Sequence, residues 1–222
     1  AGVLFFFRRI RQRPTTSLTI DYFTEPDLQA MTLHRFDVQD LPAMPWKNGG
    51  GVTREIVCLP PGAGMNDFDW RVSIAHIASD GPFSAFPGVD RVITLLSGGG
   101  VHLLSDDAQV DHRLDTPLAP FAFAGEASIH ARLLAGECHD FNVMTRRSAC
   151  SASLQVLRSA CDWPAVSQGL LMAVQGGWQL EGASPQMLAP QQGLWWSDVA
   201  MPWRLRPQSP DAALLALTLH CH

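Results

Sequence analysis

Glycine and proline interrupt this chain so often that no long helix is expected. Its 222 residues include 18 glycines and 16 prolines, and both residues end regular elements. Between them lie short runs of alternating apolar and polar residues, the period of a half-buried strand. The runs that predict strands are 52–59, 70–77, 91–96, 101–104, 128–134, 141–145, 170–174, 178–180 and 213–219. Strands at this spacing are typical of an antiparallel sandwich or barrel. Only 149–158 and 162–168 have a weakly helical pattern.

The distribution of polar residues predicts two lobes. Before about residue 148 the predicted strands carry polar side chains on one face, and after it they are more apolar. We therefore expect a first barrel over 31–147 that carries the pocket and a smaller second lobe over 148–222. Residues 1–30 are expected to lie outside the fold, either disordered or as an addition to the natural chain, with Met31 opening the first strand-like segment.

Composition excludes several classes of protein. The net charge of -5 disfavours nucleic-acid binding, which needs a basic surface. No apolar run approaches the roughly 18 residues of a membrane-spanning helix. The five cysteines are odd in number and none has C-x-x-C spacing, so they suggest neither a disulfide framework nor a zinc site. A reduced, cytoplasmic location is therefore expected.

The stretch PWKNGGGVTRE, residues 45–55, is the first candidate site. Three glycines let the backbone adopt positive φ and approach a neighbouring group closely. The turn would gather Trp46, Lys47 and Asn48, which offer a flat apolar face, a cation and an amide to a small polar ligand. The alternative is a wide hairpin turn with a buried tryptophan and a solvated lysine.

A second candidate lies on the predicted strand around 140–146. Alternation places Asp140, Asn142, Met144 and Arg146 on one face. Burying a carboxylate, an amide and a guanidinium is costly unless these groups pair or meet a ligand. The face could line the mouth of a barrel. An internal polar network or a solvated face would explain it equally well.

Motifs for metals and common cofactors are missing from the sequence. A metal-binding cupin needs H-x-H, a following glutamate and a later histidine, whereas the one H-x-H here is His220-Cys221-His222 at the end of the chain. There is no G-x-S-x-G elbow, P-loop or dinucleotide fingerprint. We therefore predict no metal and no cofactor.

Four sequence blocks together resemble the signature of the HutD family, also called Ves. They occupy 45–55, 69–75, 80–91 and 140–147. The resemblance covers about residues 34–147, is looser over 148–222, and excludes 1–30. It implies an all-β, cupin-like double barrel of antiparallel strands with few short helices, lacking the usual metal ligands. It also implies an association with histidine utilisation, in which the family regulates flux rather than catalysing a step.

These inferences lead to one main hypothesis, a metal-free bicupin that binds a small anionic metabolite in its first barrel. N-formylglutamate, formiminoglutamate and urocanate are candidate ligands. Arg71 would clamp the carboxylate, because a guanidinium forms two parallel hydrogen bonds that lysine cannot. Asp90 could equally form a structural ion pair with Arg91. The full predicted ligand-binding set is Trp46, Lys47, Asn48, Arg71, Ser84, Asp90, His130, Asp140 and Asn142.

Two other classes of function stay open from the sequence. A metal-independent isomerase or hydrolase would use His130 or Asp140 as base and Lys47 as electrophile. A protein-interaction module would use Trp195, Trp196 and Trp203 as anchors, unless these tryptophans form part of the core. The sequence leaves a homodimer open.

Overall fold

The computed structural model describes residues 8–11, 19–22, 33–182 and 184–222. The chain divides into two compact units, residues 1–33 and 34–222. In the first unit, β1 (Arg8–Arg11) and β2 (Thr19–Tyr22) pair antiparallel. The expectation that residues 1–30 lie outside the fold, either disordered or as an addition to the natural chain, stays a prediction. Met31 lies outside the described residues.

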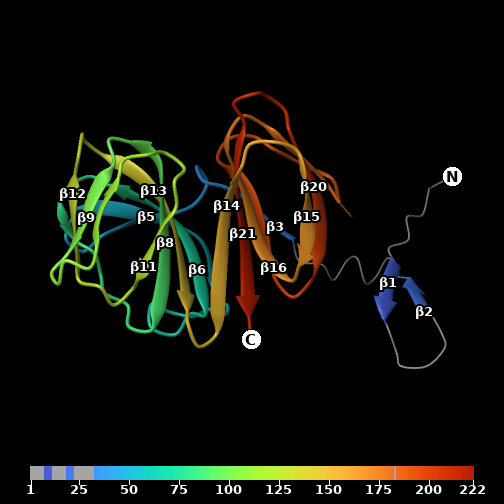
Figure 1. Ribbon diagram of the computed structural model, residues 1–222, viewed down its shortest axis with the longest axis horizontal. Coiled ribbons are helices and arrows are strands. Elements are labelled where there is room, and N and C mark those ends of the chain that lie inside the picture. Colours follow the sequence, from blue (N-terminus) through green and yellow to red (C-terminus); the bar gives the residue numbers. More distant parts are fainter. Residues whose placement is uncertain (1–7, 12–18, 23–32, 183) are drawn as a thin grey trace. The chain divides into compact units, whose positions relative to one another are not determined.

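Two barrels built from four sheets make up the second unit (Figure 1). The larger sheet of the first barrel has the order β11 (Phe121–Ala124), β8 (Val89–Gly98), β13 (Cys138–Arg146), β6 (Trp70–Ile77), β5 (Gly51–Leu59) and β4 (Ala43–Pro45). Its smaller sheet has the order β10 (Asp111–Leu114), β9 (Val101–Ser105), β12 (Ile129–Leu133) and β7 (Gly81–Pro82).

The second barrel includes one strand, β3, that precedes the first barrel in the sequence. Its larger sheet has the order β14 (Cys150–Leu157), β21 (Ala213–Cys221), β16 (Gln168–Gln175), β19 (Gln192–Trp196) and β3 (Leu33–Asp37). Its smaller sheet has the order β15 (Cys161–Val166), β20 (Met201–Pro207), β17 (Trp178–Glu181) and β18 (Gln186–Leu188). Because β3 pairs in this barrel, the predicted boundaries 31–147 and 148–222 assign that strand to the wrong lobe.

The prediction of an all-β fold is confirmed, and every predicted strand overlaps an observed one. The weakly helical segments 149–158 and 162–168 were interpreted wrongly, because they contain strands β14 and β15. Pairing with β21 and β20 outweighs their modest helix propensity. The described residues contain no helix, so none of them forms a helix that could cross a membrane.

The two barrels pack through their larger sheets. Trp70, Val72 and Phe141 from the first barrel share one hydrophobic cluster with Leu215 and Leu217 from β21. Strand β21 is buried on both faces, which explains why its sequence reads as a continuous apolar run rather than an alternation. Two of the three tryptophans proposed as anchors of an interaction module, Trp196 and Trp203, are buried, whereas Trp195 is partly buried against the cluster between the barrels.

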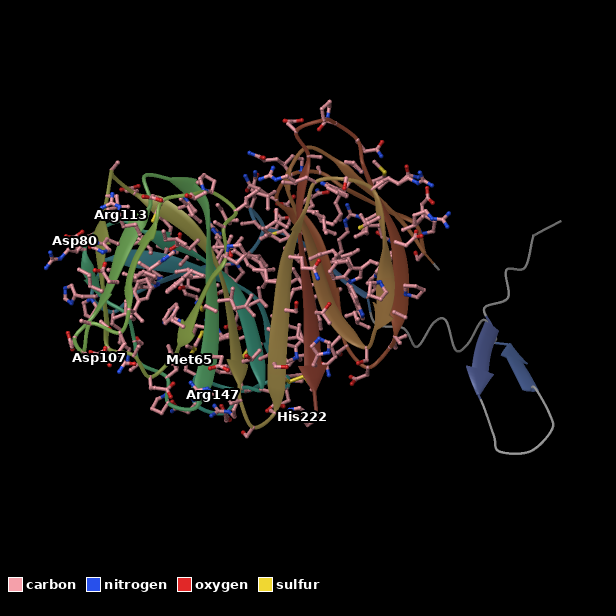
Figure 2. All side chains as sticks on the ribbon, in the orientation of Figure 1. Met65, Asp80, Asp107, Arg113, Arg147 and His222 are labelled. Atoms are coloured by element: carbon pink, nitrogen blue, oxygen red, sulfur yellow. A yellow bond between two sulfur atoms is a disulfide. The ribbon has the colours of Figure 1, made fainter. Side chains whose placement is uncertain are left out.

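A disulfide joins Cys150 to Cys221 (Figure 2). The two cysteines lie directly opposite each other where β14 pairs with β21, although 71 residues separate them in the sequence. Spacing rules could not reveal this pair, so the expectation that the cysteines form no disulfide is wrong. Disulfides are typical of oxidising compartments. The cysteine content therefore no longer supports the expected cytoplasmic location.

Candidate functional site

Two buried arginines lie in one cross-strand row inside the first barrel. Strand β13 runs between β6 and β8, and Met144 of β13 lies opposite Arg71 on one side and Arg91 on the other. Neighbouring strands are about 4.8 Å apart, so the two arginine backbones are about 10 Å apart. Alternation directs both side chains to the face that carries Ile77 and Ile93, which belong to the core of this barrel.

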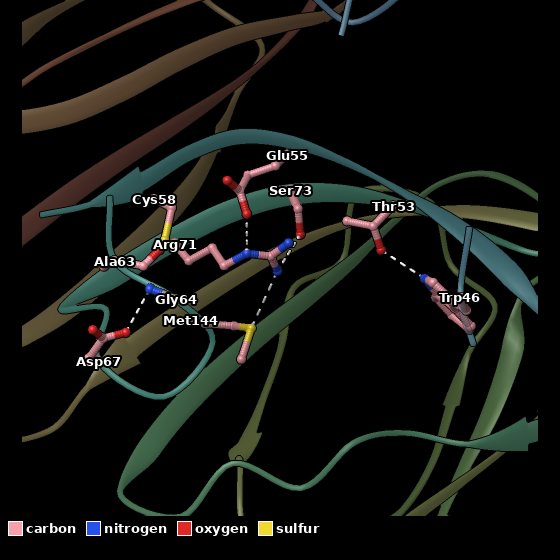
Figure 3. Close-up of polar contacts among 10 residues, drawn as sticks. All are labelled: Trp46, Thr53, Glu55, Cys58, Ala63, Gly64, Asp67, Arg71, Ser73 and Met144. Carbon is pink, nitrogen blue, oxygen red and sulfur yellow. Dashed lines mark hydrogen bonds and ion pairs between the residues drawn. The ribbon is translucent and has the colours of Figure 1, made fainter. Parts of the chain in front are cut away.

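Arg71 is held by partners on three strands (Figure 3). Its Nε donates to Glu55 Oε2 at 2.7 Å, and one Nη donates to Ser73 Oγ at 3.3 Å and to Met144 Sδ at 3.9 Å. The Arg71 side chain is 6% exposed, whereas that of Glu55 is 35% exposed. The ion pair therefore runs from the barrel interior toward solvent, and it positions the guanidinium by a charge-assisted hydrogen bond.

Arg91 has a mainly aromatic environment. Its guanidinium carbon lies 5.2, 5.9 and 5.0 Å from the ring centres of Phe83, Phe86 and Phe123, distances typical of cation–π contacts. One Nη donates a long hydrogen bond of 3.4 Å to Asn142 Oδ1, and Nε has no hydrogen-bond partner among the described residues. Burial, reinforced by the charge of Arg71, lowers the pKa of Arg91 to about 10.

Asp140 is fully buried two rows further along β13. Neither carboxyl oxygen accepts a hydrogen bond of ordinary geometry from the described residues. Burial raises the pKa of Asp140 to about 7, although the nearby Cys138 thiol and the Arg91 charge oppose the rise. Burial and the Asp140 charge raise the pKa of the Cys138 thiol to about 12, so this cysteine is not a ready nucleophile.

The polar groups of the glycine-rich turn mainly stabilise the turn itself. Trp46 Nε1 donates to Thr53 Oγ1 at 2.8 Å (Figure 3), and the Trp46 ring meets Phe83 edge-on. Asn48 Oδ1 accepts from the Gly50 N–H at 3.0 Å, which caps the turn. A Cβ on Gly51 would lie 2.4 Å from the carbonyl oxygen of His76. This close backbone approach requires glycine at position 51.

Five of the nine predicted site residues lie outside the barrel interior. Lys47, Asn48 and Ser84 are exposed. Asp90 projects from the outer face of β8, where it accepts from Arg147 Nε at 2.6 Å rather than pairing with its neighbour in sequence. His130 is exposed on the outer face of β12. The structure therefore does not bring these five together with Arg71.

The structure does bring Arg71, Asp140 and Asn142 together inside the barrel, with Trp46 packed against the same core. Sequence reasoning missed Arg91 as an interior residue. The signal was present, since Arg91 alternates in phase with Ile93 and Leu95, which are core residues. Glu55 was also missed. Its strand contains a register shift between Glu55 and Val57, which a simple alternation count does not reveal.

The charges in the interior of the first barrel do not balance. Over the described ranges, no group of three or more His, Cys, Asp or Glu side chains is placed to hold a metal ion. The interior holds two guanidinium groups, of which Glu55 pairs with that of Arg71 alone, while Asp140 is neutral over much of the pH range below 7. The interior of the first barrel then carries a net positive charge. In the second barrel, by contrast, burial of a polar side chain among the described residues is limited to Thr218.

Comparison with known proteins agrees with the fold. The family model described as HutD matches residues 38–215. Protein Ves of Cronobacter sakazakii is 44% identical over 158 residues, which cover 71% of this chain and 83% of that protein.

Solved structures give the same result. A conserved protein of unknown function from Pseudomonas aeruginosa PAO1 is 36% identical with a TM-score of 0.77, over 85% of this chain and 98% of that one. HutD from Pseudomonas fluorescens SBW25, described for a formate condition, is 30% identical with a TM-score of 0.74, over 86% of this chain and 100% of that one. A cupin 2 conserved barrel domain protein from Leptotrichia buccalis, 7% identical over 84% of this chain and 96% of that one, shares the fold with a TM-score of 0.56.

Proposed function

The chain belongs to the HutD family, and on this premise we propose that the interior of its first barrel binds a small carboxylate. The observation that carries the proposal is the row of Arg71 and Arg91, two buried cations about 10 Å apart across Met144. Buried charges of one sign are costly without a counter-charge. Glu55 compensates Arg71, but Arg91 has no acidic partner within hydrogen-bond distance among the described residues.

A carboxylate between the two guanidinium groups would supply that counter-charge. Arg71 is already oriented by Glu55 and Ser73, so little side-chain entropy is lost on binding. Arg91 Nε is a free donor for one carboxylate oxygen. A hydrogen bond to a charged group contributes about 1.5–3 kcal/mol, so two of them account for a millimolar affinity, near -4 kcal/mol.

Asp140 narrows the class of ligand. Both of its carboxyl oxygens are buried without a partner, and an N–H or O–H group of the ligand would satisfy them. The best-matched ligand therefore carries a carboxylate and, at some distance from it, a hydrogen-bond donor. N-formylglutamate, formiminoglutamate and urocanate all meet this description. We propose that such a ligand links the protein to histidine utilisation by regulating flux, without a metal.

A thermal-shift panel tests the binding proposal. Formate, glutarate, N-formylglutamate, formiminoglutamate and urocanate would each be added with and without EDTA. A ligand at 100 times its dissociation constant adds about 2.7 kcal/mol to folding, which raises the midpoint by roughly 5–10 °C in a chain of this size. A selective rise that EDTA leaves unchanged supports a carboxylate site without metal. A flat panel contradicts it.

A metal-independent enzyme is the second candidate, and Asp140 is the observation that favours it. A buried carboxyl group with a pKa of about 7 is suited to exchange protons near neutral pH. The His130 and Lys47 side chains do not share its environment, because both are exposed. Turnover of a panel compound that is lost in Asp140→Asn but kept in His130→Ala would support this candidate.

A further inference from the structure

A cleft of about 540 Å³ lies between the two barrels, on the opposite face of the larger sheet from Arg71 and Arg91. Its walls come from strands of both barrels, including Ile74 of β6 and Met172 of β16. Ile74 belongs to the cluster between the barrels, whereas Arg71 alternates to the interior face. The cleft is therefore a separate space, and its size falls within the range of small-molecule sites.

The polar groups of the cleft gather on neighbouring strands. His76 of β6 lies opposite His139 of β13, and the two rings stack with centres 4.6 Å apart at an interplanar angle of 11°. Glu137 Oε2 lies 2.9 Å from His76 Nε2, which fixes that ring. His139 is the more exposed ring, so one of its faces remains available to a flat ligand. Burial and the neighbouring His76 lower the pKa of His139, which favours the neutral ring.

Arg54 provides the cation of the cleft. It lies on β5 opposite Ile74, so its side chain is diagonal to that of His76 on the same face. One Nη donates to the carbonyl oxygen of Leu41, which holds the side chain in place. Over the described part of the chain, Arg54 forms no ion pair with an acidic side chain. Its remaining N–H groups are therefore free to bind an anion.

We propose that this cleft binds a second small molecule, a carboxylic acid with a flat aromatic or heteroaromatic body. Arg54 would bind the carboxylate, the exposed face of His139 would stack on the ring, and Ile74 and Met172 would contact its edge. The combination of one guanidinium with mostly apolar walls selects against both a bare anion and a neutral ring. Neither Arg71 nor Arg91 lines the cleft, so variants on each side test the two proposed sites separately.

trans-Cinnamate is a suitable probe because it joins a carboxylate to a flat ring. Its binding to the full-length protein would be followed by titration in NMR, with acetate and cinnamyl alcohol as controls that lack the ring or the charge. Saturable binding of cinnamate, at least about tenfold tighter than either control, is the expected result. No saturation by cinnamate, or equal binding of the three compounds, would overturn the proposal.

Matched variants locate the site. Arg54→Met should weaken cinnamate binding about tenfold or more, because it removes a charge-assisted hydrogen bond. His139→Leu should weaken it too, and this exposed position makes a folding defect unexpected. Arg113→Met, a surface variant outside both proposed sites, should leave cinnamate binding unchanged. If Arg91→Met removed binding while Arg54→Met and His139→Leu kept it, the ligand would belong to the barrel and the cleft proposal would be wrong. Melting temperatures of all variants show whether each is folded.

Discussion

Arg71 and Arg91 extend from β6 and β8 into one barrel, and the same residue of β13, Met144, lies opposite both. Their environments differ. Arg71 has an acidic partner at 2.7 Å, whereas Arg91 is surrounded by three phenylalanine rings and one amide oxygen. We therefore expect that Glu55 neutralises the charge of Arg71 within the protein, whereas a bound anion neutralises the charge of Arg91.

Replacing Arg91 with methionine should not destabilise the protein. The thioether suits the ring cage of Phe83, Phe86 and Phe123. Exchange of a buried charge for an apolar side chain is often neutral or stabilising by about 1–4 kcal/mol. Urea unfolding of wild type and Arg91→Met without ligand measures this difference. A loss of about 3–5 kcal/mol would instead assign Arg91 to a structural network.

Asp140 should make the protein less stable as the pH rises. Burial raises its pKa to about 7 in the folded state, from a reference value of 3.8. The folded state then binds more protons than the unfolded state between these values, so the free energy of unfolding decreases from about pH 4 to pH 7. The decrease amounts to about 4 kcal/mol at most. Urea unfolding at several pH values measures it.

Asp140→Asn is the matched variant for this pH effect, because it keeps the shape and cannot ionise. The unfolding free energy of the variant minus that of wild type should increase as pH rises from 4 to 8, because only wild type loses stability through Asp140. Comparing the difference cancels the titration of histidines elsewhere in the chain. A difference that stays constant with pH would show that Asp140 ionises normally.

Asp90 and His130 were both predicted as ligand-binding residues, and we now expect neither to affect binding in the barrel. Asp90 pairs with Arg147 at the surface, and such ion pairs contribute about 0–1 kcal/mol. Asp90→Asn and His130→Ala should therefore keep both stability and ligand affinity close to wild type. Calorimetric titration checks the affinity. A loss of binding in either variant would place the ligand at the outer surface.

Reduction of the disulfide should lower stability by about 2–4 kcal/mol, because the bridge between Cys150 and Cys221 closes a long loop. The double variant Cys150→Ser/Cys221→Ser should show the same loss without a reductant. Thiol titration of the denatured chain should find three thiols before reduction, on Cys58, Cys138 and Cys161. Five thiols before reduction would mean that the bridge does not form.

The all-β class could be predicted from local patterns, because strand alternation and glycine or proline breaks operate within a few residues. The cupin-like double barrel was expected only from the resemblance to the HutD family. Strand 70–77 was predicted with its observed bounds. The missed features depend on pairing between distant segments. Cys150 meets Cys221 only once β14 and β21 pair. Strand β3, near the start of the fold, belongs to the second barrel because it pairs next to β19.

The candidate site was predictable in part for the same reason. Alternation correctly placed Asp140 and Asn142 on one face of β13, and Arg71 was chosen for its chemistry. The glycine-rich turn was more misleading, since a short motif with Lys47 and Asn48 suggested a ligand site. Asn48 in fact caps its own turn. Which residues share an interior depends on the sheet order, which no single strand reveals.

The most direct test of the account is a calorimetric titration of the carboxylate that gives the largest thermal shift. It would be added to wild type, Arg71→Met and Arg91→Met, with Arg113→Met as a surface control whose ion pair with Asp115 is exposed. We predict saturable binding to wild type and the control, and a loss of about tenfold or more in each interior variant. Equal affinity in all four proteins would contradict the claim that the two interior arginines bind the anion.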